Sequence, residues 1–418
     1  MRLSALAAAA TLALLTALPA RAEIAVGEHA HERLSAFVWE ERVIHHLAML
    51  LVAEATDFHA SGHSDFTPSR PVHGDGGNAR RLVGRSLAGH PGANTLSTGD
   101  CLRITTGARV PDDADTVVQQ ENVIVEGETL RVTTMPERGM NVRDVGSDSA
   151  YDALLIPGGT RLAAADLGVL AAHGIVTVEV IRKLRVALFS TGDELVEAGA
   201  TPGEGQIHDA NRALLHALLG DAAIEIDDLG ICPDTPSALA KTLEAAREAD
   251  ALVSSGGVSV GEADHVRDVL GANGDVALWK IAMKPGRPLT FGSTGIGQIF
   301  FGLPGNPVSA ALTALLFVRP ALERMLGATA GTAHATVTAI LDGSLHKRPG
   351  RVEFQRGVLS TVQGSLPRVA TTGAQDSHIL VSLQRANCLI ELPIGSAGAK
   401  DGEKVTVHPF TGFGHSPL

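Results

Sequence analysis

The sequence predicts a multidomain protein of α/β plus β class, built around a central doubly wound parallel αβα domain. The chain has 418 residues, more than the ~250–300 at which a single core usually divides, and 44% of them are hydrophobic. From Leu184 onward, short apolar runs alternate with helix-like segments, as in a parallel sheet covered on both faces. After Gly327 the pattern changes to short strands separated by turn residues, which predicts a C-terminal β-barrel.

The strands of the central domain are expected to end in ligand-binding loops. Helices should begin at Asp209 or Asn211, at Thr235-Pro236 and at Asn306-Pro307. In an open parallel sheet the loops after the strands share one edge, where ligands bind. The predicted strands are LRVALFS (184–190), IEIDDLG (224–230), ALVSS (251–255) and GQIFFGL (297–303). The loops expected to converge are STGDEL (190–195), ICPDTP (231–236), SSGGVSVGEAD (254–264) and GLPGNP (302–307).

Charge and cysteine usage narrow the functional class. The formal charge is −12 and no run of Lys and Arg occurs, which argues against nucleic acid or an anionic membrane as partner and favours small-molecule substrates. The three cysteines form no CxxC pair, so neither a zinc site nor a disulfide framework is predicted.

The glycine- and serine-rich loop after the third strand suits phosphate oxygens. Its adjacent glycines let backbone amides approach a ligand, and its serines add hydroxyls, although an ordinary turn explains the same residues equally well. The loop matches neither GxxxxGK nor GxGxxG, so neither nucleotide fingerprint applies. The residues concerned are Ser254, Ser255, Gly256, Gly257 and Ser259.

Three acidic residues, Glu194, Asp234 and Asp264, fall in these loops. Each by itself is more often a helix cap or a solvated charge. Together at one sheet edge, they offer the hard oxygen ligands that Mg²⁺ prefers.

The segment WKIAMKPGRP (279–288) adds positive charge. If it is extended, Lys280 and Lys284 share one face, and the apolar side chains occupy the other. Two such lysines, with Arg287 beyond the turn, suit an oxyanion, whereas the alternative is a solvated edge.

Several long motifs together resemble the molybdopterin molybdenumtransferase family of the MoeA type, related to the gephyrin E domain. They run from about Arg81 to near the C-terminus: RITTGARVPDDADTVVQQEN, STGDEL, GQIHDAN, SSGGVSVGEAD, WKIAMKPGRP and FGLPGNPVSA. The resemblance implies an enzyme that binds adenylated molybdopterin, uses Mg²⁺ to cleave its pyrophosphate and inserts molybdate with release of AMP.

The resemblance also implies roles for individual residues. Glu194, Asp234 and Asp264 would serve metal binding and catalysis, and Lys280 and Lys284 would bind phosphate or molybdate. The implied substrate-binding residues are Thr106 from a neighbouring domain, Ser254, Ser255, Gly256, Gly257, Ser259, Gly261, Arg287, Pro304, Gly305 and Asn306. Arg351, Arg356, Ser377 and His378 lie in family-like segments of the barrel.

A four-domain organisation follows from the same resemblance. The expected parts are an atypical N-terminal region (1–80), with a helical start, that forms part of the linker domain, a small β domain (81–137), the rest of the elongated linker domain (138–183), the αβα molybdopterin-binding domain (184–328) and the C-terminal β-barrel (329–418).

The N-terminal region departs from the family. No segment like DNSAMDGYA occurs between Glu23 and Arg80, which weakens the expectation of the family's homodimer and leaves a second function open, a molybdopterin-binding homologue with impaired or no catalysis. His59 and His63 have helical ligand spacing, but the Ser-Gly between them argues against a helix and so against a metal site.

The first 22 residues resemble a secretory signal, with Arg2, an apolar run and Ala20-Arg21-Ala22, or else an Ala/Leu-rich helix. A third function, an exported His-rich metal binder, rests on this region alone. Export would separate the protein from an adenylated intracellular substrate, so a cytoplasmic location is expected.

Overall fold

The computed structural model describes residues 65–68, 79–92, 95–134, 136–256, 274–328 and 336–410. The described residues of 24–155 form one compact unit, and those of 156–418 form a second. No helix among the described residues is both long and apolar enough to cross a membrane. The candidate residues Gly257, Ser259, Gly261 and Asp264, and the pair His59 and His63, lie outside the described residues.

The unit of residues 24–155 contains a small β-sheet around Cys101, Leu130 and Val132, which are buried together. Strands β2 and β3 run parallel, and the other pairs are antiparallel. The strand order is β1 (Asp65–Pro68), β3 (Asp100–Ile104), β2 (Ala79–Ser86), β5 (Thr129–Val132) and β4 (Val123–Glu126), with the short helix η3 (Gln120–Asn122) before β4. The expected small β fold is present, and its sheet includes β1, which precedes residue 81.

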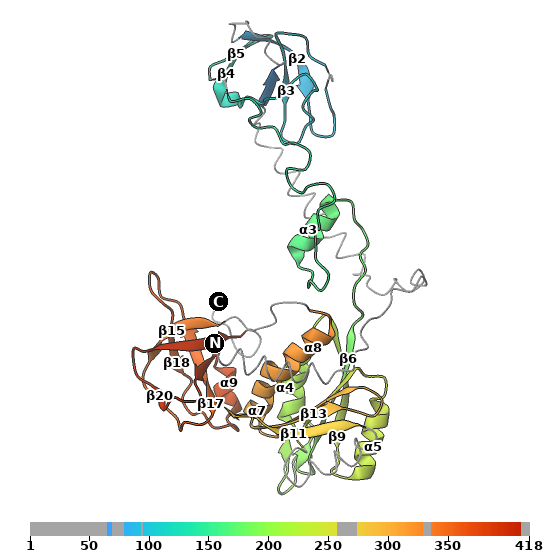
Figure 1. Ribbon diagram of the computed structural model, residues 1–418, viewed down its shortest axis with the longest axis vertical. Coiled ribbons are helices and arrows are strands. Elements are labelled where there is room, and N and C mark those ends of the chain that lie inside the picture. The colour runs from blue at the N-terminus through green and yellow to red at the C-terminus, as the bar shows by residue number, and fades with distance from the viewer. Residues whose placement is uncertain are drawn as a thin grey trace. The chain divides into compact units, whose positions relative to one another are not determined.

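The segment before the central sheet contains one helix, α3 (Ala164–Ala172), shown in green in Figure 1. The Asp166 carboxylate accepts a hydrogen bond of 2.8 Å from the Ala163 amide and so satisfies a donor at the start of this helix. After the helix, Arg182 binds Asp250 through both of its terminal nitrogens, at 2.8 and 2.5 Å. This pair attaches the segment to the loop in front of β10.

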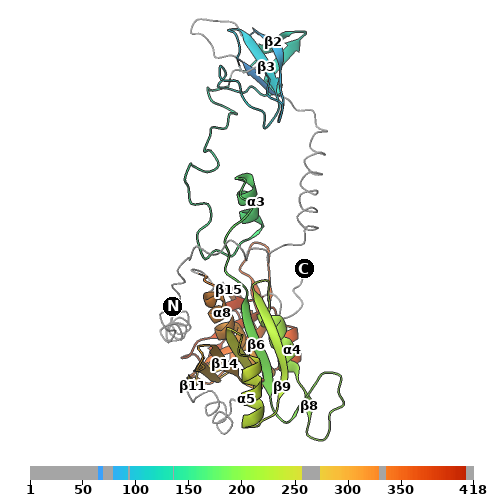
Figure 2. The same ribbon diagram turned by 90° about the vertical axis from the view of Figure 1, so that its right-hand side faces the viewer.

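The central sheet has six strands and helices on both faces (Figures 1 and 2). The four expected strands form its parallel part, which confirms the doubly wound core, and two antiparallel strands extend one edge. The order is β11 (Asp275–Lys280), β13 (Pro288–Ser293), β14 (Ile299–Leu303), β10 (Ala251–Ser255), β6 (Leu184–Thr191) and β9 (Ile224–Cys232).

Alternate residues of β6 point to the two faces, as a strand requires. Val186 and Leu188 pack with Leu215 of helix α4 (Ala210–Leu219), and Phe189 packs with Leu239 of helix α5 (Pro236–Ala245) on the opposite side (Figure 2). Helices α7 (Pro307–Thr313), η4 (Ala314–Val318) and α8 (Arg319–Met325) follow β14.

The helices begin at the expected positions, but only two of the three expected capping side chains form a capping hydrogen bond. The Asp209 carboxylate accepts from the Arg212 amide and Thr235 accepts from the Ala238 amide, so both are true N-caps. Asn306 stands at the N-cap of α7, but its side chain makes no capping bond.

The C-terminal part is a closed five-stranded barrel, as the short strands predicted. The closing pair is β17 with β19, and Leu341, Val369, Ile390 and Val407 are fully buried inside. Around the barrel the strands are β17 (Val352–Ser360), β18 (Arg368–Thr371), β15 (Val337–Asp342), β21 (Lys404–Pro409) and β19 (Cys388–Leu392). Smaller elements are β16 (Leu345–His346), β20 (Gly398–Ala399) and helix α9 (Leu380–Gln384).

The lysine-containing segment 279–288 is not one extended strand, and the expectation that Lys280 and Lys284 share a strand face is wrong. Strand β11 ends at Lys280, the chain bends at Ala282, and β12 (Met283–Lys284) pairs with β17 of the barrel. The Val352 amide donates to the Ala282 carbonyl at 2.9 Å. Tertiary pairing with the barrel overrides the local period of two, so Lys280 belongs to the central sheet and Lys284 to the barrel edge.

Candidate functional site

The loops that follow β6 and β9 meet at the carboxyl edge of the central sheet. The Asp193 carboxylate accepts a hydrogen bond of 3.3 Å from the Asp234 amide. Glu194 is exposed, and its carboxylate lies over Gly192, where a Cβ would come within 2.5 Å of Oε2. Two of the three predicted acidic residues, Glu194 and Asp234, therefore lie on touching loops, and Asp193 joins them. Asp193 is not among the residues predicted from the sequence, although it stands beside Glu194 in STGDEL.

The loops that follow β10 and β14 are also in contact. The Gly256 amide donates to the Leu303 carbonyl at 3.1 Å. Gly256 has φ of +88°, and a Cβ there would lie 2.3 Å from the Thr191 carbonyl oxygen. A glycine is required at this position because the backbones of β6 and β10 approach each other so closely.

Asn211 of helix α4 connects two of the four loops through its side-chain amide. It donates at 2.8 Å to the Ser255 hydroxyl at the end of β10 and at 2.7 Å to the Gly305 carbonyl in GLPGNP. Asp209 is the cap of α4, so the alternative reading of Asn211 as the cap is wrong. The sequence pointed to Asn211 only through its place in the family-like motif GQIHDAN. Its bridging role could not be predicted, because the two partners of its side chain lie far along the chain.

Arg212, the next residue, fixes the start of α4. Its guanidinium binds Asp209 at 3.1 Å, Asp228 at 2.7 Å and also Glu197. Burial lowers the pKa of Arg212, but the bonds to these carboxylates outweigh burial and raise the pKa. Glu197 follows the short strand β7 (Leu195–Val196), which pairs with β8 (Ile207–His208), so Arg212 ties this ribbon to the sheet.

Several hydroxyls at this edge are buried without a hydrogen-bond partner. Ser190, Thr191 and Ser254 are 0%, 8% and 1% exposed, and no described residue satisfies their oxygen atoms. A buried hydroxyl left unpaired costs about 1–3 kcal/mol. A polar ligand at this edge would offset that cost.

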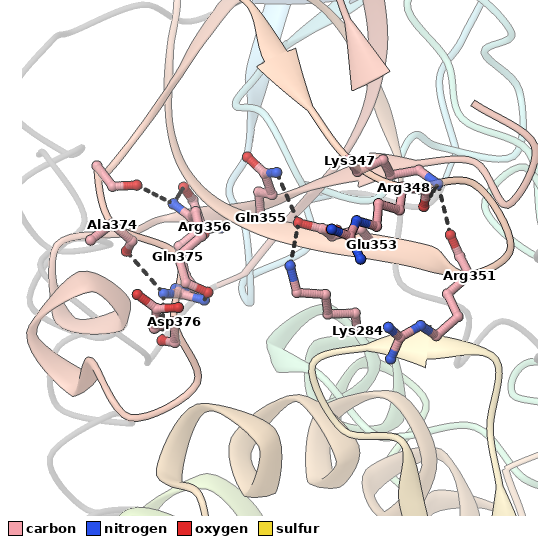
Figure 3. Close-up of polar contacts among 11 residues, drawn as sticks. Lys284, Lys347, Arg348, Arg351, Glu353, Gln355, Arg356, Ala374, Gln375 and Asp376 are labelled. Carbon is pink, nitrogen blue, oxygen red and sulfur yellow. Dashed lines mark hydrogen bonds and ion pairs between the residues drawn. The ribbon is translucent and has the colours of Figure 1, made fainter. Parts of the chain in front are cut away.

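The positive residues divide between the central sheet and the barrel. Lys280 and Arg287 are exposed. Lys284 Nζ lies 3.3 Å from the Glu353 carboxylate, which also accepts from the Gln355 amide at 3.0 Å (Figure 3).

Arg356 of the barrel has a positioning role. Its side chain is completely buried and donates to the carbonyls of Ala374, Gln375 and Asp376 at 3.0–3.1 Å (Figure 3). Burial lowers the pKa of Arg356. The loop that it holds continues into Ser377, whose carbonyl accepts from the Val308 amide at 3.1 Å. The family-like barrel loop with Ser377 and His378 therefore reaches the start of α7, directly after GLPGNP.

Thr106 lies in the other compact unit. It is exposed at a turn after β3, where Gly107 has φ of +81°. For the metal site, the described residues contain no cluster of three or more His, Cys, Asp or Glu side chains arranged to hold an ion. The third predicted acidic ligand, Asp264, lies outside these residues.

The fold is that of a multidomain protein with a small β unit, a doubly wound sheet and a barrel. At one edge of the sheet, loops that carry acidic and hydroxyl side chains come together. Family models match three regions of the chain. They describe a probable molybdopterin binding domain (residues 187–324), the MoeA N-terminal region, domains I and II (59–174), and the MoeA C-terminal region, domain IV (338–410).

Relatives of known name match over most of the chain. The molybdopterin molybdenumtransferase of Haemophilus influenzae is 38% identical over 331 residues, which cover 79% of this chain and 82% of that protein. The Nostoc sp. molybdopterin molybdenumtransferase is 36% identical over 330 residues, covering 78% and 76%. The crystal structure of the molybdopterin biosynthesis moeA protein of Pyrococcus horikoshii OT3 has a TM-score of 0.70 at 29% identity and covers 83% of this chain and 86% of that one. The chain belongs to the molybdopterin molybdenumtransferase family.

Proposed function

We propose that this protein inserts molybdenum into adenylated molybdopterin and releases AMP, as a step of molybdenum cofactor biosynthesis. The observation that carries the proposal is the Asn211 bridge, because it joins the Ser255 and Gly305 loops of a family-matched molybdopterin-binding domain into one surface. The Haemophilus influenzae relative carries the name of this activity.

The phosphate end of the substrate would bind at the ends of β6 and β10. The unpaired hydroxyls of Ser190, Thr191 and Ser254 supply donors there, and hydrogen bonds to phosphate oxygens would satisfy them. Gly256, Pro304, Gly305 and Asn306 would shape the adjoining surface. From the sequence we also assign Gly257, Ser259 and Gly261 to substrate binding in this loop.

Glu194 and Asp234 would hold Mg²⁺, with Asp264 as the third ligand. The donor set fits, since carboxylate oxygens from touching loops are the ligands that this ion prefers. When bound, the ion would supply positive charge that offsets the negative charge of the pyrophosphate. The Asp193 carboxylate, by accepting from the Asp234 amide, orients that loop.

The basic residues would receive the anions. Lys280, Lys284 and Arg287 supply positive charge toward molybdate and toward the departing phosphate of AMP, and such preorganised charge stabilises a transition state. Thr106 would contribute from the small β unit. We further propose a cytoplasmic enzyme, and we expect the family's homodimer to be weakened here because the N-terminal family segment is missing.

The test is to incubate the protein with adenylated molybdopterin, molybdate and Mg²⁺ and to measure the released AMP by chromatography. Metal-dependent release supports the proposal, and removal of the metal by chelation should abolish it until Mg²⁺ is restored. Binding of the adenylated substrate without AMP release would instead identify a binding homologue.

A further inference from the structure

Arg212 joins three elements that lead to the candidate site. Its guanidinium donates to Asp209 Oδ2 at 3.1 Å, to Asp228 Oδ1 at 2.7 Å and to the Glu197 carboxylate. The three acceptors belong to the start of α4, to strand β9 and to the β7–β8 ribbon, by which we mean residues 195–208 (Figure 2). One side chain therefore connects three segments that are separate in the sequence.

The contacts of Arg212 are partly shielded from water. The Arg212 side chain is 14% exposed and that of Asp209 is 1% exposed. Burial raises the pKa of Asp228, but hydrogen bonds from Arg212 and from the Gly230 amide outweigh burial and hold the pKa of Asp228 below its usual value. Charge-assisted hydrogen bonds away from solvent are strong, and the planar guanidinium fixes the directions of its donors. Arg212 can therefore fix geometry as well as balance charge.

The β7–β8 ribbon begins directly after Glu194. The Glu194 carbonyl accepts a hydrogen bond of 2.8 Å from the Ile207 amide, so the backbone of Glu194 is tied to the far end of the ribbon. Glu197 lies three residues after Glu194 and is bound by Arg212. Movement of the ribbon would therefore move Glu194, and Arg212 restrains that movement.

Strand β9 leads into the loop that contains Asp234. The register between β6 and β9 slips directly after Asp228, where β9 carries one extra residue. Such a bulge redirects the chain that follows it and interrupts the regular ladder of backbone hydrogen bonds. Arg212 binds Asp228 at this interruption, six residues before Asp234. The direction in which β9 delivers Asp234 therefore depends in part on Arg212.

We propose that Arg212 is a positioning residue for the metal site, because it holds the β7–β8 ribbon and β9 against the start of α4 and so sets where the Glu194 and Asp234 carboxylates lie. The inference rests on the proposed function in one respect, the assignment of Glu194 and Asp234 to a divalent cation. Arg212 acts only through these two residues. An arginine that merely stabilised the fold would change the free energy of unfolding and leave the metal affinity of the folded protein unchanged.

The proposal predicts weaker metal binding in a protein that remains folded. Arg212→Gln removes the charge and the fork of donors, and the apparent dissociation constant for Mn²⁺ should rise about tenfold, as is typical when a group that orients metal ligands is lost. Arg212→Lys keeps the charge without the planar fork and should give an intermediate value. Glu197→Gln releases only the ribbon, and its effect should be smaller, about threefold, because that side chain is 57% exposed.

The measurement is titration of the full chain with Mn²⁺, in which the free ion is followed by electron paramagnetic resonance and Mg²⁺ is then added as competitor. Circular dichroism and urea unfolding establish that each variant is folded. Arg185→Gln is the matched control. It breaks another guanidinium–carboxylate pair between β6 and β9, with Asp227 at 3.3 Å, nearer the amino end of β6. Its Mn²⁺ affinity should equal that of the unaltered protein.

Unchanged Mn²⁺ affinity in folded Arg212→Gln would overturn the proposal, and so would an equal loss in Arg185→Gln. If Arg212→Gln does not fold, Glu197→Gln decides, and unchanged affinity in that variant refutes the positioning role. Absence of Mn²⁺ binding by the unaltered protein would also refute it. The AMP-release assay decides the proposed function separately, because a protein that binds Mn²⁺ through Arg212-dependent geometry but releases no AMP would retain this inference and lose that function.

Discussion

At the scale of single residues, Asn211 carries the strongest argument for a convergent site. Replacing it with alanine removes donors to the Ser255 hydroxyl and the Gly305 carbonyl, and should lower the free energy of unfolding by about 1–2 kcal/mol. Asn211→Asp should be worse, because a carboxylate cannot donate to the Gly305 oxygen. Urea unfolding measures the loss, and AMP release should fall with it.

The matched control for Asn211 is His216→Ala, an exposed position on the same helix. It should change the free energy of unfolding by no more than a few tenths of a kcal/mol. If Asn211→Ala behaves like this control, the bridge does not hold the loops together.

The backbone at Gly256 gives a second prediction at this scale. Gly256→Ala combines a positive φ with a Cβ placed 2.3 Å from the Thr191 oxygen, whereas Gly297→Ala has φ of +87° and open space around it. Gly297→Ala should cost about 1–2 kcal/mol for the backbone conformation alone. Gly256→Ala should cost clearly more, and equal losses in urea unfolding would contradict the close approach of β6 and β10.

At the scale of elements, the pair of Arg182 and Asp250 joins the linker segment to the central sheet. Burial raises the pKa of Asp250, but hydrogen bonds from Arg182 and Arg185 outweigh burial and hold the pKa below its usual value. A carboxyl group with a lowered folded-state pKa stabilises the fold above its unfolded pKa, about 3.9, and loses this contribution as the pH falls through the folded value.

Arg182→Gln should therefore lower the free energy of unfolding by about 1 kcal/mol at pH 7, since the arginine is largely exposed and its pair is partly screened. The difference from the unaltered protein should shrink as the pH is lowered from 5 to 3. Arg247→Gln removes a largely exposed pair with Glu244 and should show almost no difference at either pH. A pH-independent effect of Arg182→Gln would rule out the electrostatic explanation.

Elements of the fold differ in how far the sequence predicts them. The parallel strands and the caps at Asp209 and Thr235 follow from local composition, because continuous apolar runs and capping residues act within a few positions. Local composition does not predict strands β11 and β13, nor the pairing of Lys284 with the barrel. These features depend on pairing with other strands, as in the pairing of Lys284 with Glu353. Such pairing leaves no trace in the local hydrophobic pattern.

The residues of the candidate site also differ in how far the sequence predicts them. Glu194, Asp234 and Ser254 can be predicted to lie at this edge from the sequence, because each lies at or after the end of a recognisable strand. Asp193 and Asn211 were missed or misassigned, since their partners, the Asp234 amide and the Gly305 carbonyl, come from other loops.

At the scale of the whole molecule, the missing N-terminal family segment leads to a prediction about assembly. If residues 23–80 lack the contact that the family uses, the chain should dimerise weakly, and light scattering at increasing concentration should show mostly monomer. A stable dimer at low concentration would show that the dimer contact does not require that segment.

The bend at Ala282 has a consequence for movement within the larger unit. Only three residues separate Lys280 at the end of β11 from Lys284 on the barrel edge, so their Cα atoms can never lie more than about 14 Å apart. A tilt of the barrel against the sheet would therefore change the spacing of these two residues only within this limit. A ligand that binds both lysines would fix that tilt, and a change in the tilt would alter the affinity for such a ligand. If the proposed anion site includes both lysines, the barrel would form one side of that site, and the mobility of the barrel should fall when an oxyanion is bound.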